Sequence, residues 1–427
     1  MSKKLWAAVL LGFLMIGGRA IAAEDTIKVG ILHSLSGTMA ISETTLKDAM
    51  LMFIEEQNKK GGLLGKKIEA VVVDPASDWP LFAEKARDLL TTQKVSAVFG
   101  CWTSVSRKSV LPVFEGENGL LFYPVQYEGE ESSRNVIYTG ASPNQQAIPA
   151  VDYLMNDLKA QRFVLAGTDY VFPRTANKIL EAYLLAKGVA KADIMVNYTP
   201  FGHSDWQSII ADIKKFGATG KKTAIISTIN GDANVPFYKE LANQGIKASS
   251  IPVMAFSVGE EELSGIDTKP LVGHLAAWNY FESVDTQANR DFIKKWQAFT
   301  KNPKRVTNDP MEAHYIGFNL WVQAVEKAKS TKVDDVLKAI VGLSVPNLTG
   351  GKATLLPNHH ITKPVLIGEI QDDGQFQIVW QTPKEVPGDA WSDYLPESKD
   401  LEADWTPPIN CGNYNKVTKK CGGAATK

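Results

Sequence analysis

The chain has 427 residues, of which 44% are hydrophobic, and this length predicts two or more domains with large cores. Its 46 lysines and arginines nearly balance 47 aspartates and glutamates. This balance, without a clustered basic excess, argues against nucleic acid as a partner.

The N-terminus has the pattern of a secretory signal peptide. Lys3 and Lys4 precede a short apolar run over residues 5–17, and small residues follow at 20–23. The run is shorter than the about 20 residues that span a bilayer, and no later stretch is long and apolar enough. We therefore expect residues 1–23 to be a cleavable signal peptide. The mature protein is expected to be soluble and periplasmic, without stable membrane insertion.

A β-α-β-α-β-α-β pattern follows. β-rich apolar runs alternate with segments whose apolar residues recur at helical spacing, and such alternation predicts a parallel sheet covered by helices. The expected strands cover 27–32, 68–73, 95–99 and 119–122, and the expected helices cover 42–58, 79–92 and 104–114.

The pattern then restarts, which predicts a second α/β lobe. The expected helices cover 145–158, 174–187, 205–216 and 233–243, and the expected strands cover 163–166, 193–197, 223–227 and 252–255. After about residue 273, helices are expected at 286–300 and 309–329, and β-rich stretches at 364–371 and 375–381.

Ligands of open α/β sheets bind at the carboxyl ends of the strands. The loops expected there carry aromatic rings and a few polar groups, which suit a small, neutral, polar ligand, although core packing is the alternative for each ring. The candidate ligand-binding residues are Trp102, Ser104, Tyr123, Gln126, Tyr127, Glu128, Asp169, Tyr170, Phe172, Asp232 and Tyr280.

Motifs for catalysis are missing. The chain has no P-loop, GxSxG or HExxH motif, and the glycines of residues 61–65 join a helix to a strand, the reverse of a dinucleotide site. His33 ends a strand beside Ser34 and Ser36, where a hydrogen-bonding role is favoured over a catalytic one. No His/Cys cluster suggests a metal. We expect no catalytic residue, metal or cofactor.

The cysteines predict one disulfide. Cys411 and Cys421 lie close together in a polar tail over residues 383–427, and an oxidising compartment would favour a bridge between them. Cys101 is expected to be a buried, unpaired residue after a strand. The tail, rich in Pro, Gly and charge, is expected either to wrap a surface or to be partly disordered.

Several segments carry a family resemblance. Residues 27–37 and 58–65 (NKKGGLLG) resemble type I periplasmic binding proteins of the branched-chain amino-acid/amide class. More specific segments look like its urea/short-chain-amide subfamily, which comprises urea-importer binding proteins and a cytoplasmic amide sensor. These segments are 100–108 (GCWTSVSRK), 121–129 (LFYPVQYEG), 140–145 (GASPNQ), 167–174 (GTDYVFPR), 227–234 (STINGDAN) and 278–281 (WNYF).

The resemblance implies a fold of two doubly wound α/β lobes joined by a three-segment hinge, the Venus-flytrap arrangement. The N-terminal lobe is expected over 24–143 and 274–348, and the C-terminal lobe over 144–273 and 349–382. The implied function is that of an ABC-importer binding component, which delivers urea or a short amide to permease subunits at the inner membrane.

Residue by residue, the amide sensor has a tyrosine at the Trp102 position and a serine at the Ser104 position. Its tyrosine and threonine in the next loop match Tyr123 and Val125, and Phe172 replaces a tyrosine. The loss of the hydroxyl at Val125 argues against acetamide.

The loop that carries Asp232 has no acid in the sensor. A carboxylate there suits the second NH₂ of urea better than the methyl of acetamide, which favours urea; the alternative is that Asp232 caps the next helix. Short amides, an amino acid and a sensor role remain as alternatives. For an amino acid no pocket arginine is evident, because Arg107 and Arg174 lie within helix starts where they can point outward.

Overall fold

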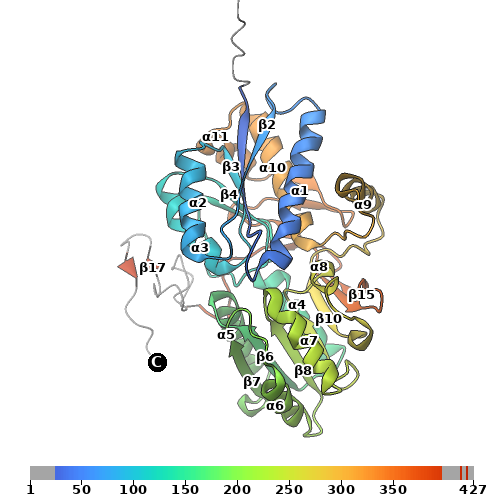
Figure 1. Cartoon of the computed structure of the whole chain (residues 1–427). Helices are drawn as coiled ribbons and strands as arrows, with labels where there is room; N and C mark the ends of the chain where they lie inside the picture. The colour runs from blue at the N-terminus through green and yellow to red at the C-terminus, as the bar shows by residue number, and fades with distance from the viewer. Residues whose placement is uncertain (1–24, 397–413, 416–419, 422–427) are drawn as a thin grey trace, which may run out of the picture.

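The computed structural model describes residues 25–396, 414–415 and 420–421. Two sheets form two lobes, one above the other in Figure 1, with α1, α2, α3 and α10 around the first sheet and α5, α6 and α7 around the second. The expected fold class of two doubly wound lobes is confirmed.

The first sheet has the strand order β2-β1-β3-β4-β5, and all its pairs are parallel. Helix α1 packs on α10, α2 on α3, and α10 on α11. The strands are β1 (Ile27–Leu32), β2 (Ile68–Val73), β3 (Ala97–Gly100), β4 (Leu121–Tyr123) and β5 (Val136–Tyr138). The helices are α1 (Ala40–Lys59), α2 (Trp79–Thr91), α3 (Ser104–Gly116), α9 (Gln287–Thr300), α10 (Asp309–Ala328) and α11 (Val333–Ile340).

The second sheet has the order β15-β14-β10-β9-β8-β6-β7, with antiparallel pairs at β10–β14 and β14–β15. Its strands are β6 (Arg162–Thr168), β7 (Ile194–Thr199), β8 (Thr223–Thr228), β9 (Val253–Ala255), β10 (Leu275–Trp278), β14 (Leu366–Ile370) and β15 (Phe376–Gln381). Its helices are α4 (Ala147–Asn156), α5 (Val171–Ala186), α6 (Gln207–Gly217), α7 (Asn234–Asn243) and α8 (Glu260–Leu263).

Short elements complete the chain. They are the 3₁₀ helices η1 (Pro143–Gln145), η2 (Lys191–Asp193), η3 (Gly231–Ala233) and η4 (Lys269–Leu271), and three two-stranded pairs. The pairs are β11 (Ser344–Pro346) with β12 (Lys352–Thr354), β13 (Thr362–Lys363) with β16 (Val386–Pro387), and β17 (Tyr414–Asn415) with β18 (Lys420–Cys421).

Local sequence explains where helix α2 begins. Asp78 caps α2 by accepting a hydrogen bond from the backbone N–H of Leu81 (2.8 Å), and a proline follows within the first turn. Parallel strands are covered on both faces, so β6 and β8 are buried along their whole length.

The strand pairing corrects the expected lobe boundaries. Strand β10 pairs with β9 and β14 in the second sheet, so the expected first-lobe range 274–348 begins too early. Strands β12 and β13 pair with β11 and β16, and His360 forms a bridge with Tyr138 of β5. The expected C-terminal-lobe range 349–382 therefore contains a segment that lies on the first lobe.

The first crossing between the lobes lies against the loop that follows β4. Gly140, just after β5, approaches Val125 so closely that an added Cβ would lie 2.1 Å from the Val125 carbonyl carbon and oxygen. A side chain cannot fit there, so this hinge segment and the Val125 loop are in backbone contact.

The expected signal peptide lies outside the described residues, as do Cys411 and the side chain of Cys421, and with them the expected disulfide. Cys101 is buried and unpaired, as expected. Among the described residues, no helix has the length and apolar character needed to cross a membrane.

Candidate functional site

The loops at the strand ends of the two lobes meet face to face. Backbone contact is made where the N–H of Asp232 donates to the carbonyl oxygen of Thr38 (3.2 Å). Side-chain hydrogen bonds join Trp102 Nε1 to Asn230 Oδ1 (3.3 Å), Gln126 Nε2 to Ser257 Oγ (2.6 Å) and Ser42 Oγ to Glu262 Oε1 (2.6 Å). The structure therefore represents a closed arrangement of the lobes.

A tight turn after β3 positions Trp102 and Ser104. An added Cβ at Gly100 would lie 2.2 Å from the carbonyl oxygen of Leu32, and Cys101 has a left-handed φ of 67°. Thr103 then caps α3 by accepting from the N–H of Ser106 (3.1 Å). Trp102 and Ser104, on either side of this cap, are both buried.

Beneath this turn lies a buried ionic cluster formed by Arg107, Lys108, Glu128 and Glu131. Arg107 donates from Nε to Glu131 Oε1 (2.9 Å) and from Nη2 to Glu128 Oε1 (3.0 Å). Its Nη1 donates to Ser104 Oγ (3.1 Å), and Ser104 in turn donates to Glu128 Oε2. Lys108 Nζ donates to Glu131 Oε2 (3.0 Å). Two cations thus face two carboxylates, with no excess charge.

The charges within this cluster determine the direction in which the pKa values of Arg107 and Glu131 shift. Burial acts to lower the pKa of Arg107, but the carboxylates of Glu131 and Glu128 outweigh it and hold the pKa well above its usual value. Burial acts to raise the pKa of Glu131, but Arg107 and Lys108 lower it to about 2. Both groups are therefore ionised at neutral pH.

Aromatic rings enclose the guanidinium. Arg107 lies over the rings of Tyr123 and Tyr127, with its central carbon 4.7 and 4.6 Å from their centroids. The hydroxyl of Tyr123 donates to the carbonyl oxygen of Trp102 (2.5 Å). Tyr127 stacks on Tyr138 and hydrogen-bonds to His360 Nε2 (2.5 Å). These contacts hold the rings of Tyr123 and Tyr127 in place on the first lobe.

The second lobe contributes rings from the start of α5. Tyr170 and Phe172 are both buried, and Tyr170 packs at 4.8 Å, centroid to centroid, on Phe201. Burial raises the pKa of Tyr170, and the nearby Tyr123 and Glu128 act in the same direction. The effect of Glu128 on this pKa indicates that Tyr170 lies near the ionic cluster of the first lobe.

The side chains of three expected site residues lie outside the ionic cluster. Asp169 is exposed and pairs with Arg174 Nε (2.5 Å), because the turn before α5 directs it outward. Asp232 is exposed in η3, and no side-chain cap of α7 is formed. The Tyr280 hydroxyl is held in the hinge by Asn289 Oδ1 (2.6 Å) and Thr307 Oγ1 (2.7 Å). These residues do not join the cluster.

The structure also shows the direction of the Arg107 side chain and the partners of His33. Arg107, whose direction the sequence left open, is buried at the centre of the cluster. Its position three residues after Ser104, on the same helical face, was the available clue. His33 hydrogen-bonds to Glu43 Oε2 (3.1 Å) and His314 Nε2 (2.8 Å), which confirms its hydrogen-bonding role.

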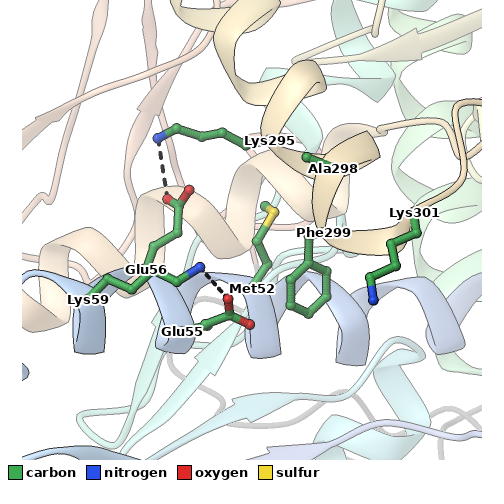
Figure 2. Close-up of a pocket in the computed structure, with 8 residues that line it drawn as sticks. All are labelled: Met52, Glu55, Glu56, Lys59, Lys295, Ala298, Phe299 and Lys301. Atoms are coloured by element: carbon green, nitrogen blue, oxygen red, sulfur yellow. Dashed lines mark hydrogen bonds and ion pairs between the residues drawn. The ribbon is translucent and has the colours of Figure 1, made fainter.

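A separate surface groove of about 540 Å³ lies between α1 and α9 (Figure 2). Met52 and Phe299 line it, and Glu56 pairs across it with Lys295 (3.4 Å). It adjoins the C-terminal half of α1, whereas Ser42, at the other end of that helix, faces the second lobe. Among the described residues no cluster of three or more acidic, histidine or cysteine side chains is arranged for a metal.

Two α/β lobes whose strand-end loops contact each other have the arrangement of a hinged ligand-binding protein. The model of the family described as periplasmic binding protein domain matches residues 27–397, and the chain belongs to this family.

Relatives and solved structures agree with this assignment. The chain is 23% identical over 384 residues to the Leu/Ile/Val-binding protein homolog 6 of Brucella melitensis, covering 88% of this chain and 95% of the relative. A shorter match, 29% over 120 residues, covers 28% of this chain and only 22% of a Geobacillus stearothermophilus protein named limonene hydroxylase.

Among solved structures, a solute-binding protein of an ABC transporter from Rhodopseudomonas palustris, in complex with p-hydroxybenzoic acid, has a TM-score of 0.75 at 22% identity, covering 86% of this chain and 99% of that one. The isoleucine complex of a branched-chain amino-acid transporter binding protein from Streptococcus pneumoniae has a TM-score of 0.70 at 18% identity, covering 85% and 100%. These likenesses concern the fold.

Proposed function

We propose that this protein is the periplasmic solute-binding component of an ABC importer, and that it captures urea between its lobes and presents the closed complex to permease subunits. The role as a transporter's binding component is supported by family membership and by a similar solved structure that is described as the solute-binding protein of an ABC transporter. The choice of urea rests on the chemistry of the cleft.

The choice of urea depends on one observation: Arg107 already donates its hydrogen bonds to oxygens of the protein. Its three side-chain nitrogens make four donor contacts, out of five N–H bonds, to oxygens of Ser104, Glu128 and Glu131, and the two carboxylates already balance its charge. A carboxylate ligand such as isoleucine or a hydroxybenzoate needs a cation or several N–H donors, and breaking this buried network to supply one would cost several kcal/mol, about 3–5 by analogy with other buried ion pairs. An uncharged ligand avoids that cost.

Donor-rich ligands fit the remaining groups. Glu128 offers carboxylate oxygens, and the buried Gln126 Oε1 has no hydrogen-bond partner. Urea carries four N–H bonds, so it can donate to such acceptors. Trp102, Tyr170 and Phe172 would enclose its small faces. Closure then requires only that urea binds the closed state better than the open one.

Short amides form the second candidate because formamide and acetamide share the NH₂ and carbonyl groups. Asp232 does not favour urea over acetamide in this structure, because its carboxylate is exposed. Discrimination between urea and acetamide is therefore assigned to Glu128, whose carboxylate can accept the second NH₂.

The test is titration calorimetry of the mature protein with urea, formamide, acetamide, isoleucine and 4-hydroxybenzoate. Urea is expected to bind, and the two carboxylates are not. Two matched amide substitutions then compare the contributions of Glu128 and Asp232 to urea affinity. Glu128→Gln should weaken urea binding by tenfold or more, about 1.4 kcal/mol, whereas Asp232→Asn should leave it unchanged. Preferred binding of isoleucine or 4-hydroxybenzoate would refute the assignment of a neutral ligand.

A further inference from the structure

The C-terminal segment beyond the second sheet runs back over the first lobe. After β15 the chain passes Thr382, whose N–H donates to the carbonyl oxygen of Val365 (2.9 Å), and then forms β16 against β13. We call residues 386–395 the C-terminal strap. The strap lies beside the first-lobe loop that carries Glu128 and Glu131.

The strap is anchored on the hinge. Gln145 Nε2, in the first crossing, donates to the carbonyl oxygen of Val386 (2.7 Å) and to that of Ile361 (2.8 Å). The N–H of Asp389 donates to Ser142 Oγ (3.1 Å). The strap therefore joins the first crossing to the segment around Ile361.

Through Glu130, the strap also contacts the loop that carries Glu128 and Glu131, which we call the ionic loop. The N–H of Glu130 donates to the carbonyl oxygen of Ala390 (2.5 Å), and the N–H of Ser392 donates to Glu130 Oε1 (2.8 Å). Gly129 and Glu130 both have left-handed φ values, of 70° and 56°, and an added Cβ at Gly129 would lie 2.8 Å from the Ala390 oxygen. A non-glycine residue in this region is uncommon and needs external support, which the strap supplies.

The end of the strap contacts the second lobe. The Tyr394 ring packs edge-on against Tyr183 of α5, with centroids 5.0 Å apart. Helix α5 also carries Phe172 in its first turn, next to Tyr170. One short segment thus touches the ionic loop of one lobe and the ring-bearing helix of the other.

We propose that the C-terminal strap is a positioning element for ligand binding: through Glu130 it holds the loop in the conformation that presents Glu128 to the cleft, and through Tyr394 it links that loop to α5. Glu130 and Tyr394 are positioning residues, not ligand contacts. This inference rests on the proposed binding of a ligand between the lobes and adds residues that set its affinity.

The experiment compares full-length Glu130→Met, which keeps the length but removes the acceptor, with Glu130→Gln, which keeps an oxygen for Ser392. Amide hydrogen exchange of residues 128–131 without ligand should accelerate about tenfold in Glu130→Met and return towards wild type in Glu130→Gln. The Kd for urea should rise about tenfold in Glu130→Met and recover in Glu130→Gln. Tyr394→Ala should weaken urea binding in the same direction, and Tyr394→Phe, which retains the ring, should not.

The outcomes separate the strap from the ligand assignment. A lower melting temperature in Glu130→Met with unchanged exchange at residues 128–131 and unchanged Kd would make the strap purely structural and overturn the inference. If the wild-type protein does not bind urea, the proposed function fails, and the exchange comparison, which uses no ligand, still decides whether the strap orders the loop.

Discussion

Replacement of Glu131 by glutamine tests the buried ionic cluster most directly. Glu131 accepts from Arg107 Nε (2.9 Å), Lys108 Nζ (3.0 Å) and the Tyr138 hydroxyl (2.6 Å), and these groups hold its pKa at about 2 instead of 4.5. A pKa difference of one corresponds to about 1.4 kcal/mol, so the ionised carboxylate contributes about 3 kcal/mol to folding.

Because folding lowers the pKa of Glu131, the contribution of its carboxylate to stability depends on pH. The contribution is fully present above pH 4.5, the ordinary pKa, and is lost as the pH falls towards 2. Glu131→Gln should therefore lower the free energy of unfolding by about 3 kcal/mol at pH 7, and the difference from wild type should shrink below pH 4.5.

The assay is equilibrium unfolding in guanidinium chloride, which avoids urea because urea is the proposed ligand. The matched control is Glu117→Gln, since Glu117 forms a surface pair with Arg87 (2.8 Å) and should change stability by less than about 1 kcal/mol. Equal effects of the two substitutions at pH 7 would refute the reasoning.

Two further predictions concern Glu312, a buried acid in the first turn of α10, and the ring of Trp102. Burial raises the pKa of Glu312 to about 7, with Asp309 adding to the effect and Lys363 opposing it; its contribution to stability is therefore present at low pH and lost as the pH rises through 7. Glu312→Gln should stabilise the protein at pH 8 by up to about 3 kcal/mol and have little effect at pH 4, measured by the same unfolding assay; a loss of stability at pH 8 would contradict this. Trp102→Ala should weaken urea binding by at least about tenfold in calorimetry, with Trp102→Phe intermediate; unchanged affinity in both would assign the ring to core packing.

Local pattern was sufficient for most of the fold. The strands β1 and β2 are rich in apolar and β-branched residues, each with one charged residue (Lys28 and Glu69), and their predicted bounds are those of the structure. Strand β5 was not predicted, and β10 was not assigned to the second lobe. Sheet membership depends on pairing with strands far away in the sequence, which a local pattern cannot report.

The candidate site was predictable as a set of loops but not as a set of side-chain directions. The strand-end rule identified the loops of Trp102, Ser104 and Glu128, which the structure brings together. It could not distinguish Asp169, which turns outward to Arg174. The direction of each side chain depends on the turn before a helix and on charged partners elsewhere in the chain. For the same reason, the hydrogen bonds between the strap and Glu130 could not be predicted from the local sequence.

The backbone contact between Gly140 and Val125 has a consequence for redesign. Because an added Cβ at Gly140 would lie 2.1 Å from the Val125 carbonyl, the loop after β4 cannot be exchanged for that of another binding protein on its own. A transplant that keeps its shape would have to carry the loop, the first crossing and the strap together. The smallest exchangeable unit of specificity is thus a discontinuous module, assembled from segments more than 200 residues apart.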